Sequence, residues 1–227
     1  MKTFYELQEG LNDPNIFKAF FLAGGPGSGK SYVVRKTTGG TGLKVVNSDN
    51  AFEKLLKDAG LSLKMPSDQE TERDVVRSKA KKLTSKMQKN YLEGRIGIVL
   101  DGTGREYDKI AKHKSELESL GYDCYMIFVN TSLDVALERN TMRDRNVPED
   151  IVIKSWKVVQ NNIGKFNSLF KSGMIIVDNN KADEDIEMMA FKRVKSLLNR
   201  KVTNSRAKQW ISMEMKRRGI TKKPKGF

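Results

Sequence analysis

The chain has 227 residues, of which 38% are hydrophobic and 31% charged, and its 42 Lys and Arg residues exceed its 28 Asp and Glu residues, for a net charge of +14. This length and composition predict one domain with a sizeable core, with or without a tail, and the single cysteine, Cys124, excludes an internal disulfide. The first residues lack the apolar segment of a signal peptide, and the longest apolar run, residues 19–23, is too short to span a bilayer. We therefore expect a cytoplasmic protein with a reduced, buried thiol and no membrane partner.

The first predicted strand, residues 16–23, leads directly into a glycine-rich loop. The sequence GGPGSGKS, residues 24–31, matches the phosphate-loop (P-loop) pattern G-x-x-x-x-G-K-[ST], and a helical segment follows it. Glycines allow the main-chain N–H groups to turn toward one point, and the start of the helix adds partial positive charge there. We predict ATP and Mg²⁺ as cofactors. The residues predicted to bind ATP are Gly25, Gly27, Ser28, Gly29, Lys30, Ser31 and, from a later segment, Arg139.

The second predicted strand, residues 43–47, ends in NSDN, which places Asp49 just beyond the carboxyl end of the sheet, where ligands of parallel α/β folds bind. A carboxylate there can accept the proton of an attacking hydroxyl, so Asp49 is the candidate general base. The alternative is that Asp49 caps the helix that follows.

A long helix is predicted between the second and third strands. Its expected buried stripe consists of Val76, Ala80, Leu83, Met87 and Tyr91. A lysine ridge on another face consists of Lys79, Lys82, Lys86 and Lys89. Such a ridge is either a solvated face or a surface for nucleic acid.

The third predicted strand, residues 95–101, ends in LDGTGR. Asp101 then occupies the position of an acidic residue that holds Mg²⁺, together with the Ser31 hydroxyl. The DGTG sequence is also typical of a simple turn.

The fourth strand, residues 122–129, precedes a predicted helix that contains Arg139 and Arg143. Because residues four apart share a helix face, both arginines can close over the phosphates and stabilise charge that develops during phosphoryl transfer. Together with Asp49 and Lys30 they form our catalytic set. The alternative is an ordinary surface helix whose arginines pair with Glu138 and Asp144.

A fifth strand at residues 173–178 and a helix at residues 186–198 complete the pattern of apolar runs separated by helices, which predicts a parallel α/β sheet. The positive charge is concentrated after this point: residues 192–227 contain 13 Lys and Arg and one acidic residue, Glu214. Such a block attracts a polyanion or serves as a solubilising tail.

The segments GGPGSGKS, NSDN, VLDGTG and RNTMRDRNVPEDI occur in an order that resembles the P-loop kinases that include phage polynucleotide 5'-hydroxyl kinase and the zeta-toxin-like kinases. The resemblance covers about residues 16–180 and implies an α/β fold: a parallel five-stranded sheet with helices on both faces, a helical lid and a basic C-terminal helical extension. The implied domains are a kinase domain, residues 1–200, and the extension, residues 201–227.

By the same resemblance, Asp49 would be the general base, Lys30 and Ser31 the nucleotide and metal contacts, and Arg139 and Arg143 the lid arginines. The chain departs from the 5'-end kinases at Phe52, where they have an arginine that seats the acceptor. Lys54 could substitute for it. Phe52 could stack on a nucleobase, although packing in the core is the more common role of such a residue.

The implied reaction is transfer of the γ-phosphoryl group of ATP to a hydroxyl. The basic C-terminus and the lysine ridge favour nucleic acid, DNA above all, as the acceptor. The hydroxyl would be the hydroxymethyl group of a modified pyrimidine, as in phage 5-hydroxymethyluracil DNA kinases of infected bacterial cells, or a 5' end. The alternatives are a zeta-toxin-like kinase of a nucleotide sugar or small metabolite, and a nucleic-acid-binding P-loop ATPase. The sequence indicates no oligomeric state.

Overall fold

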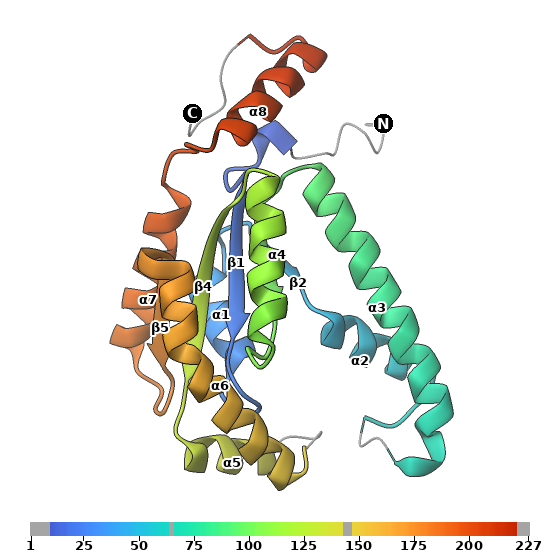
Figure 1. The fold of residues 1–227 in the computed structure, drawn as a ribbon. Coiled ribbons are helices and arrows are strands. Elements are labelled where there is room, and N and C mark those ends of the chain that lie inside the picture. Colours follow the sequence, from blue (N-terminus) through green and yellow to red (C-terminus); the bar gives the residue numbers. More distant parts are fainter. Residues whose placement is uncertain (1–9, 64–65, 143–146, 222–227) are drawn as a thin grey trace.

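A five-stranded parallel sheet forms the centre of the molecule in a computed structural model that describes residues 10–63, 66–142 and 147–221 (Figure 1). The strand order is β2-β3-β1-β4-β5, and all neighbouring pairs are parallel. The strands are β1 (Lys18–Ala23), β2 (Lys44–Val46), β3 (Ile98–Asp101), β4 (Asp123–Asn130) and β5 (Met174–Asp178). All five lie within the apolar runs of the sequence or overlap them, so the predicted α/β fold is confirmed.

Helices cover both faces of the sheet. The described α-helices are α1 (Lys30–Thr38), α2 (Ser48–Asp58), α3 (Glu70–Glu93), α4 (Tyr107–Ser119), α5 (Leu133–Thr141), α6 (Glu149–Phe170), α7 (Glu184–Leu198) and α8 (Ser205–Arg218). Short 3-10 helices are η2 (Gly10–Asn12), η3 (Ser67–Gln69) and η4 (Lys171–Gly173). One buried cluster joins β1 to α1 and α7, and a second joins the opposite face of β1 to α4 and α6. Alternate residues of β1 therefore enter different cores, as in a strand covered on both sides.

Helices α2 and α3 lie beside the β2 edge of the sheet and pack mainly on each other (Figure 1). Their contact is a separate buried cluster in which Phe52 and Leu56 of α2 meet Val76 and Ala80 of α3. Phe52 is 1% exposed, and the guanidinium of Arg77 lies 4.3 Å from the centre of its ring. Core packing is thus the role of Phe52, and its ring is not free to stack on a nucleobase.

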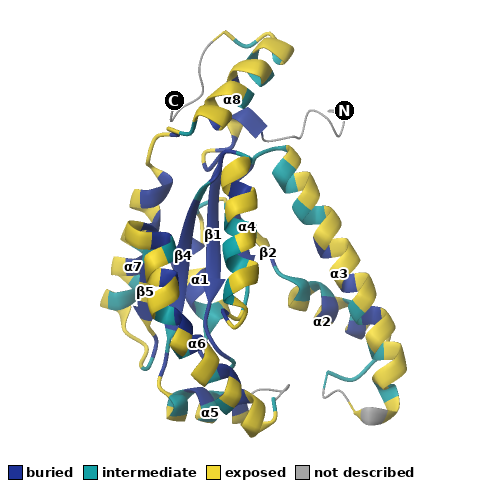
Figure 2. Cartoon of the chain, in the orientation of Figure 1, coloured by how far each residue is buried: buried dark blue, intermediate teal, exposed yellow. Residues whose placement is uncertain are grey.

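The predicted stripe of α3 is only partly correct. Val76 and Ala80 are buried, but Leu83 is 54% exposed and Thr84 is buried instead. Steps of four residues carry the buried face from Val76 to Ala80 and Thr84. Leu83 is seven residues after Val76 and so nearly in line with it, but it lies outside the buried cluster with α2. The four ridge lysines are exposed. Helical geometry places Lys82 and Lys86 on the side of α3 away from Val76 and Ala80, and Figure 2 shows that much of α3 is exposed.

Helix α8 packs against the amino end of the sheet, at the top of Figure 1. Its residues Ala207 and Ile211 are buried in the same cluster as β1, and the ring of Trp210 meets Phe17 edge to face with centroids 5.6 Å apart. Several basic residues of this segment are engaged within the chain, since Glu214 accepts hydrogen bonds from Arg217 and Arg218. This part of the basic C-terminus therefore packs on the domain.

Cys124 is buried in β4, as predicted, and burial raises the pKa of its thiol. None of the helices in the described ranges is both long and apolar enough to cross a bilayer.

Candidate active site

The P-loop, residues 24–31, connects the carboxyl end of β1 to α1 in a conformation that requires glycine. Gly27 has φ +76° and Gly29 has φ +81°, values that are strained for other residues. A Cβ atom at Gly27 would collide with the carbonyl oxygen of Ala136 in α5, and one at Gly29 would collide with the side-chain amide of Asn179. The loop is thus enclosed by α5 and by the segment that follows β5.

The start of α1 has the features of a phosphate site. Gly29 is the N-cap residue and provides no side-chain hydrogen bond to the first N–H groups of the helix. The Nζ atom of Lys30 folds back over the loop and donates to the carbonyl oxygens of Gly24 (2.7 Å) and Gly25 (3.1 Å). The hydroxyl of Ser28 is buried without a hydrogen-bond partner among the described residues. These donors and the positive end of the helix dipole suit an anion such as a triphosphate.

Asn47 links the two acidic residues predicted to carry out the chemistry. It is the N-cap of α2 and accepts a hydrogen bond from the main-chain N–H of Asp49 at 2.6 Å. Its side-chain amide donates to Oδ2 of Asp101 at 2.5 Å. Since β2 and β3 are parallel neighbours, their last residues meet at the same edge of the sheet. The cap of α2 is therefore Asn47, and the interpretation of Asp49 as the capping residue is wrong.

Asp101 is the last residue of β3 and lies close to both Lys30 and Asp49. Burial raises the pKa of its carboxyl, the nearby Asp49 raises it further, and Lys30 acts in the opposite direction. A cation beside Asp101 would favour the charged form. No group of three or more His, Cys, Asp or Glu side chains suited to a metal occurs in the described part of the chain. A Mg²⁺ ion at Ser31 and Asp101 would therefore take most of its ligands from phosphate and water.

The DGTG segment also acts as a turn that fastens β3 to β1. Gly102 donates its N–H to Leu22 O (3.1 Å), and Gly24 donates to Thr103 O (3.1 Å). The amide of Asn162 in α6 donates to the carbonyls of Gly104 and Arg105, each at 3.0 Å. The DGTG segment thus forms a turn, and this is compatible with the predicted role of Asp101 at a metal site.

This turn forms one wall of a cavity of about 510 Å³. Asp101, Thr103, Arg105 and Lys109 supply polar groups to its lining, and apolar side chains such as Val158 supply the rest. A volume of this size accommodates a small molecule or one nucleotide.

Arg139 lies beside the P-loop in α5, but its guanidinium is engaged with the chain itself. It donates to the carbonyl oxygens of Asn179 (2.6 Å) and Asn180 (3.4 Å). Asn179 in turn donates from its side chain to Ser28 O at 2.8 Å. Arg139 therefore connects α5, the segment after β5 and the P-loop. Arg143 and Asp144 lie outside the described residues, and α5 ends at Thr141.

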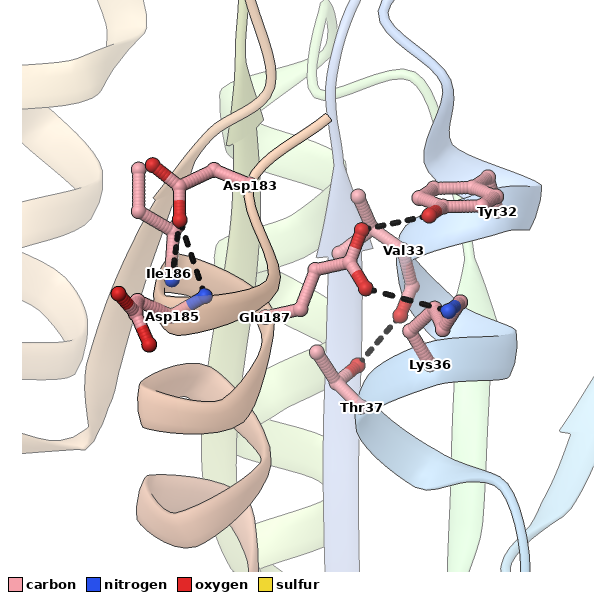
Figure 3. Close-up of polar contacts among 8 residues, drawn as sticks. All are labelled: Tyr32, Val33, Lys36, Thr37, Asp183, Asp185, Ile186 and Glu187. Carbon is pink, nitrogen blue, oxygen red and sulfur yellow. Dashed lines mark hydrogen bonds and ion pairs between the residues drawn. The ribbon is translucent and has the colours of Figure 1, made fainter. Parts of the chain in front are cut away.

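A polar cluster between α1 and α7 holds the first turns of α1 in place (Figure 3). The carboxylate of Glu187 accepts a hydrogen bond from Tyr32 (2.6 Å) and pairs with Lys36 (3.3 Å). The Tyr32 hydroxyl is the main cause of the lowered pKa of Glu187. Asp183 caps α7 through the N–H groups of Asp185 and Ile186.

Three polar residues of this region were missed at the level of the sequence: Asn47, Asn179 and Arg105. Asn47 is the last residue of a predicted strand, and Asn179 and Arg105 follow one by one and four residues. The carboxyl ends of parallel strands share one edge of a sheet. That position was the available signal. Their partners, however, lie 54 residues away for Asn47 and 151 for Asn179. The contacts could not be read from local spacing.

Comparisons with known proteins agree with this geometry. The family model described as Zeta toxin matches residues 8–187. No curated protein matches the sequence.

Several solved structures share the fold. A structure from the PezAT chromosomal toxin–antitoxin system of Streptococcus pneumoniae has 13% identity and a TM-score of 0.53, covering 86% of this chain and 92% of that chain. The AvrRxo1-ORF1:-ORF2 structure with ATP has 18% identity and a TM-score of 0.55, covering 76% of this chain and 57% of that chain. A gluconokinase from Sinorhizobium meliloti 1021 has 16% identity and a TM-score of 0.50, covering 81% of this chain and 95% of that chain.

Proposed function

Because this chain belongs to the zeta toxin family, a group of P-loop kinases, we propose that it transfers the γ-phosphoryl group of ATP to a hydroxyl group. The observation that carries the proposal is the bridge made by Asn47, which links Asp49 to Asp101 beside Lys30. A base, a metal-binding carboxylate and a phosphate-binding lysine at one edge of the sheet are what phosphoryl transfer requires.

In this proposal the acceptor hydroxyl gives its proton to the carboxylate of Asp49, which is exposed at the first turn of α2. The acceptor oxygen bonds to the γ phosphorus as the bond between that phosphorus and the ADP oxygen breaks. Lys30 and the P-loop amides hold the phosphates, and Ser31 and Asp101 would hold Mg²⁺. The ion, when bound, supplies positive charge to the phosphate oxygens.

Arg139 and Arg143 are proposed to stabilise the transferring group. For Arg139 this requires its guanidinium to exchange one of its carbonyl partners for a phosphate oxygen, a short movement because it already lies beside Gly29. We also propose that the chain divides into a kinase domain, residues 1–200, and a basic extension, residues 201–227.

Nucleic acid is the proposed acceptor class, with a hydroxymethyl pyrimidine in DNA or a polynucleotide 5' end as the reactive hydroxyl. The support is the net charge of +14 and the presence of Arg35 in the same cavity as Ser31 and Asp101. The burial of Phe52 removes the reason to prefer the modified base over the 5' end.

A small metabolite or nucleotide sugar is the second candidate acceptor. The cavity of about 510 Å³ beside Asp101 favours it, because that space suits a compact ligand. The likeness to a gluconokinase fold is compatible with the same class.

The test is incubation of the protein with γ-labelled ATP, Mg²⁺ and one acceptor at a time: 5'-hydroxyl DNA, 5-hydroxymethyluracil DNA, nucleotide sugars and gluconate. Label in DNA supports the first candidate and label in a metabolite supports the second. Release of label only as free phosphate, with every acceptor, contradicts a kinase and indicates an ATPase.

A further inference from the structure

The contact between α2 and α3 holds one arginine against an aromatic ring and gives it no charged partner. The guanidinium of Arg77 in α3 lies over the ring of Phe52 in α2, 4.3 Å from the ring centre. Phe52 is 1% exposed, so its ring is a fixed support. Arg77 is half-buried, and it forms no hydrogen bond or ion pair with any residue that the structure describes.

A guanidinium in this state is suited to bind an anion. Its N–H groups lie in one plane and form a fork that matches two oxygens of a phosphate. Contact with an aromatic ring attracts the cation without using these donors. Because the ring also restrains the side chain, less conformational entropy is lost when a ligand binds. The N–H groups of Arg77 are therefore left to solvent or to a ligand.

Arg77 contacts α2 within one helical turn of the candidate general base. Phe52 follows Asp49 by three residues, which is about 5 Å along the axis of α2. Asp49 is also seven residues before Leu56 and so nearly in line with it, on the side of α2 that faces α3. Leu56 is buried there, whereas Asp49 is exposed. The space beside Asp49 is thus open, and Arg77 lies next to it.

The face of α3 that carries Arg77 turns toward the rest of the domain. Gln88 comes eleven residues later, which is three helical turns and within about 20° of the same face. The side-chain amide of Gln88 contacts Nε2 of His113 in α4 at 3.0 Å. His113 lines the cavity of about 510 Å³ that also contains Asp101. Arg77 therefore lies on the side of α3 that faces α4 and this cavity.

We propose that Arg77 binds a phosphate group of the acceptor and so holds the nearby hydroxyl of the acceptor beside Asp49. The proposal rests on the proposed function and adds a residue that determines which acceptors are used. Phosphate is the chemistry that nucleic acid and nucleotide sugars, two of the candidate acceptors, have in common. An acceptor without an anionic group would leave the guanidinium without a partner and would bind more weakly.

The test measures binding of two phosphate-bearing probes by calorimetry, with the P-loop already filled by Mg²⁺ and a non-hydrolysable ATP analogue. The probes are the dinucleotide TpT, which has a free 5' hydroxyl, and UDP-glucose, and thymidine is the reference without phosphate. Arg77→Met removes the charge and keeps a flexible apolar chain over Phe52. Arg73→Met is the matched control, because it removes the same charge one turn earlier on α3, where Arg73 donates to Pro66 O (3.1 Å).

We expect Arg77→Met to weaken binding of the probe that the wild type prefers by about 10- to 100-fold, the effect of losing hydrogen bonds to a charged group. If that probe is TpT, its affinity should fall to that of thymidine. Arg77→Lys should give a smaller loss, since it keeps the charge but not the planar fork. Arg73→Met should stay within about twofold of wild type, and no variant should change ATP affinity by more than about twofold.

Binding of both probes by Arg77→Met within about threefold of wild type would overturn the proposal. An equal loss in Arg73→Met, or a wild type that binds neither probe, would overturn it as well. The phosphotransfer assay separates this result from the proposed function. A probe that binds through Arg77 but is never labelled contradicts the kinase and leaves the phosphate site standing. A labelled acceptor whose binding does not depend on Arg77 contradicts the phosphate site and leaves the kinase standing.

Discussion

The two ends of the β-sheet are built from different chemistry. At the amino end the rings of Phe17, Tyr122 and Trp210 pack edge to face, and the ammonium of Lys18 meets Asp123 at 2.6 Å. At the carboxyl end, Gly27 and Gly29 have left-handed backbone conformations. The amino end pairs Lys18 with Asp123 within the chain. The carboxyl end keeps groups that suit a ligand, such as the buried hydroxyl of Ser28, which has no hydrogen-bond partner among the described residues.

The comparison also shows that the basic helix α8 and the candidate active site lie at opposite ends of the sheet. Helix α8 contains five Lys and Arg residues and one Glu. It lies at the amino end of the sheet, and the six residues of β1 put about 20 Å between it and the P-loop. Its Arg206 donates to Ser119 O at 2.8 Å. Charge counted along the sequence therefore identified a basic segment but not its position relative to the reaction.

The largest effect should follow from a substitution that adds a side chain inside the P-loop. Gly27→Ala should reduce ATP affinity at least 100-fold, because the added methyl group collides with the main chain of α5. Gly40→Ala is the matched control: Gly40 has a similar φ of +73°, yet a Cβ there meets nothing within 4 Å. The Gly40 variant should be destabilised only by backbone strain, about 1 kcal/mol, and its ATP affinity should stay within threefold of wild type. Calorimetric titration with ATP measures both. Equal affinity of the two variants would mean that the loop is not enclosed as described.

A change at the amino end should affect stability and not chemistry. Trp210→Ala removes a half-buried ring and its contact with Phe17, and we expect unfolding in urea to lose about 2 kcal/mol. The exposed neighbour Lys208→Ala should change stability by less than about 0.5 kcal/mol. ATP binding by the folded Trp210 variant should match wild type at 25 °C. A loss of ATP binding in a protein that is still folded would break the separation between the two ends.

The smallest effect is a gain in stability at the carboxyl end. Because burial raises the pKa of Asp101, stability falls as the pH rises from the ordinary pKa of an aspartate to the raised pKa of the folded state, and the loss stays constant at higher pH. Asp101→Asn removes this dependence and should melt a few degrees higher than wild type at pH 8, with a smaller difference at pH 5. The same variant should lose Mg²⁺-dependent transfer. A lower melting temperature of the variant at pH 8 would contradict the conclusion that the buried, ionised carboxylate of Asp101 destabilises the folded state.

Much of the fold followed from local patterns. Apolar runs bounded by turn residues predicted all five strands, and the P-loop spacing predicted a phosphate site between β1 and α1. The orientation of α3 was harder. Leu83 is apolar and Thr84 polar, yet Thr84 is buried, because α2 and the sheet, and not hydropathy alone, determine which face is covered.

The candidate site shows more clearly that local sequence patterns do not reveal contacts between distant segments. Asp49, Lys30 and Asp101 were predicted from their places after strands, and the structure brings their neighbourhoods together. Asn47 received no role, although it bonds to both acidic residues, because that role depends on the distance between the ends of β2 and β3. The roles of Asp49 and of the other predicted site residues stay predictions.

The most direct test of the account is the rate of a single turnover with Asp49→Asn. With γ-labelled ATP and whichever acceptor the wild type labels, we predict a loss of 10²-fold or more in transfer, since general-base catalysis typically contributes about 10² to 10⁴. ATP affinity should stay within about threefold, because the side chain of Asp49 lies outside the P-loop. Transfer by Asp49→Asn at a rate close to wild type would contradict the central claim.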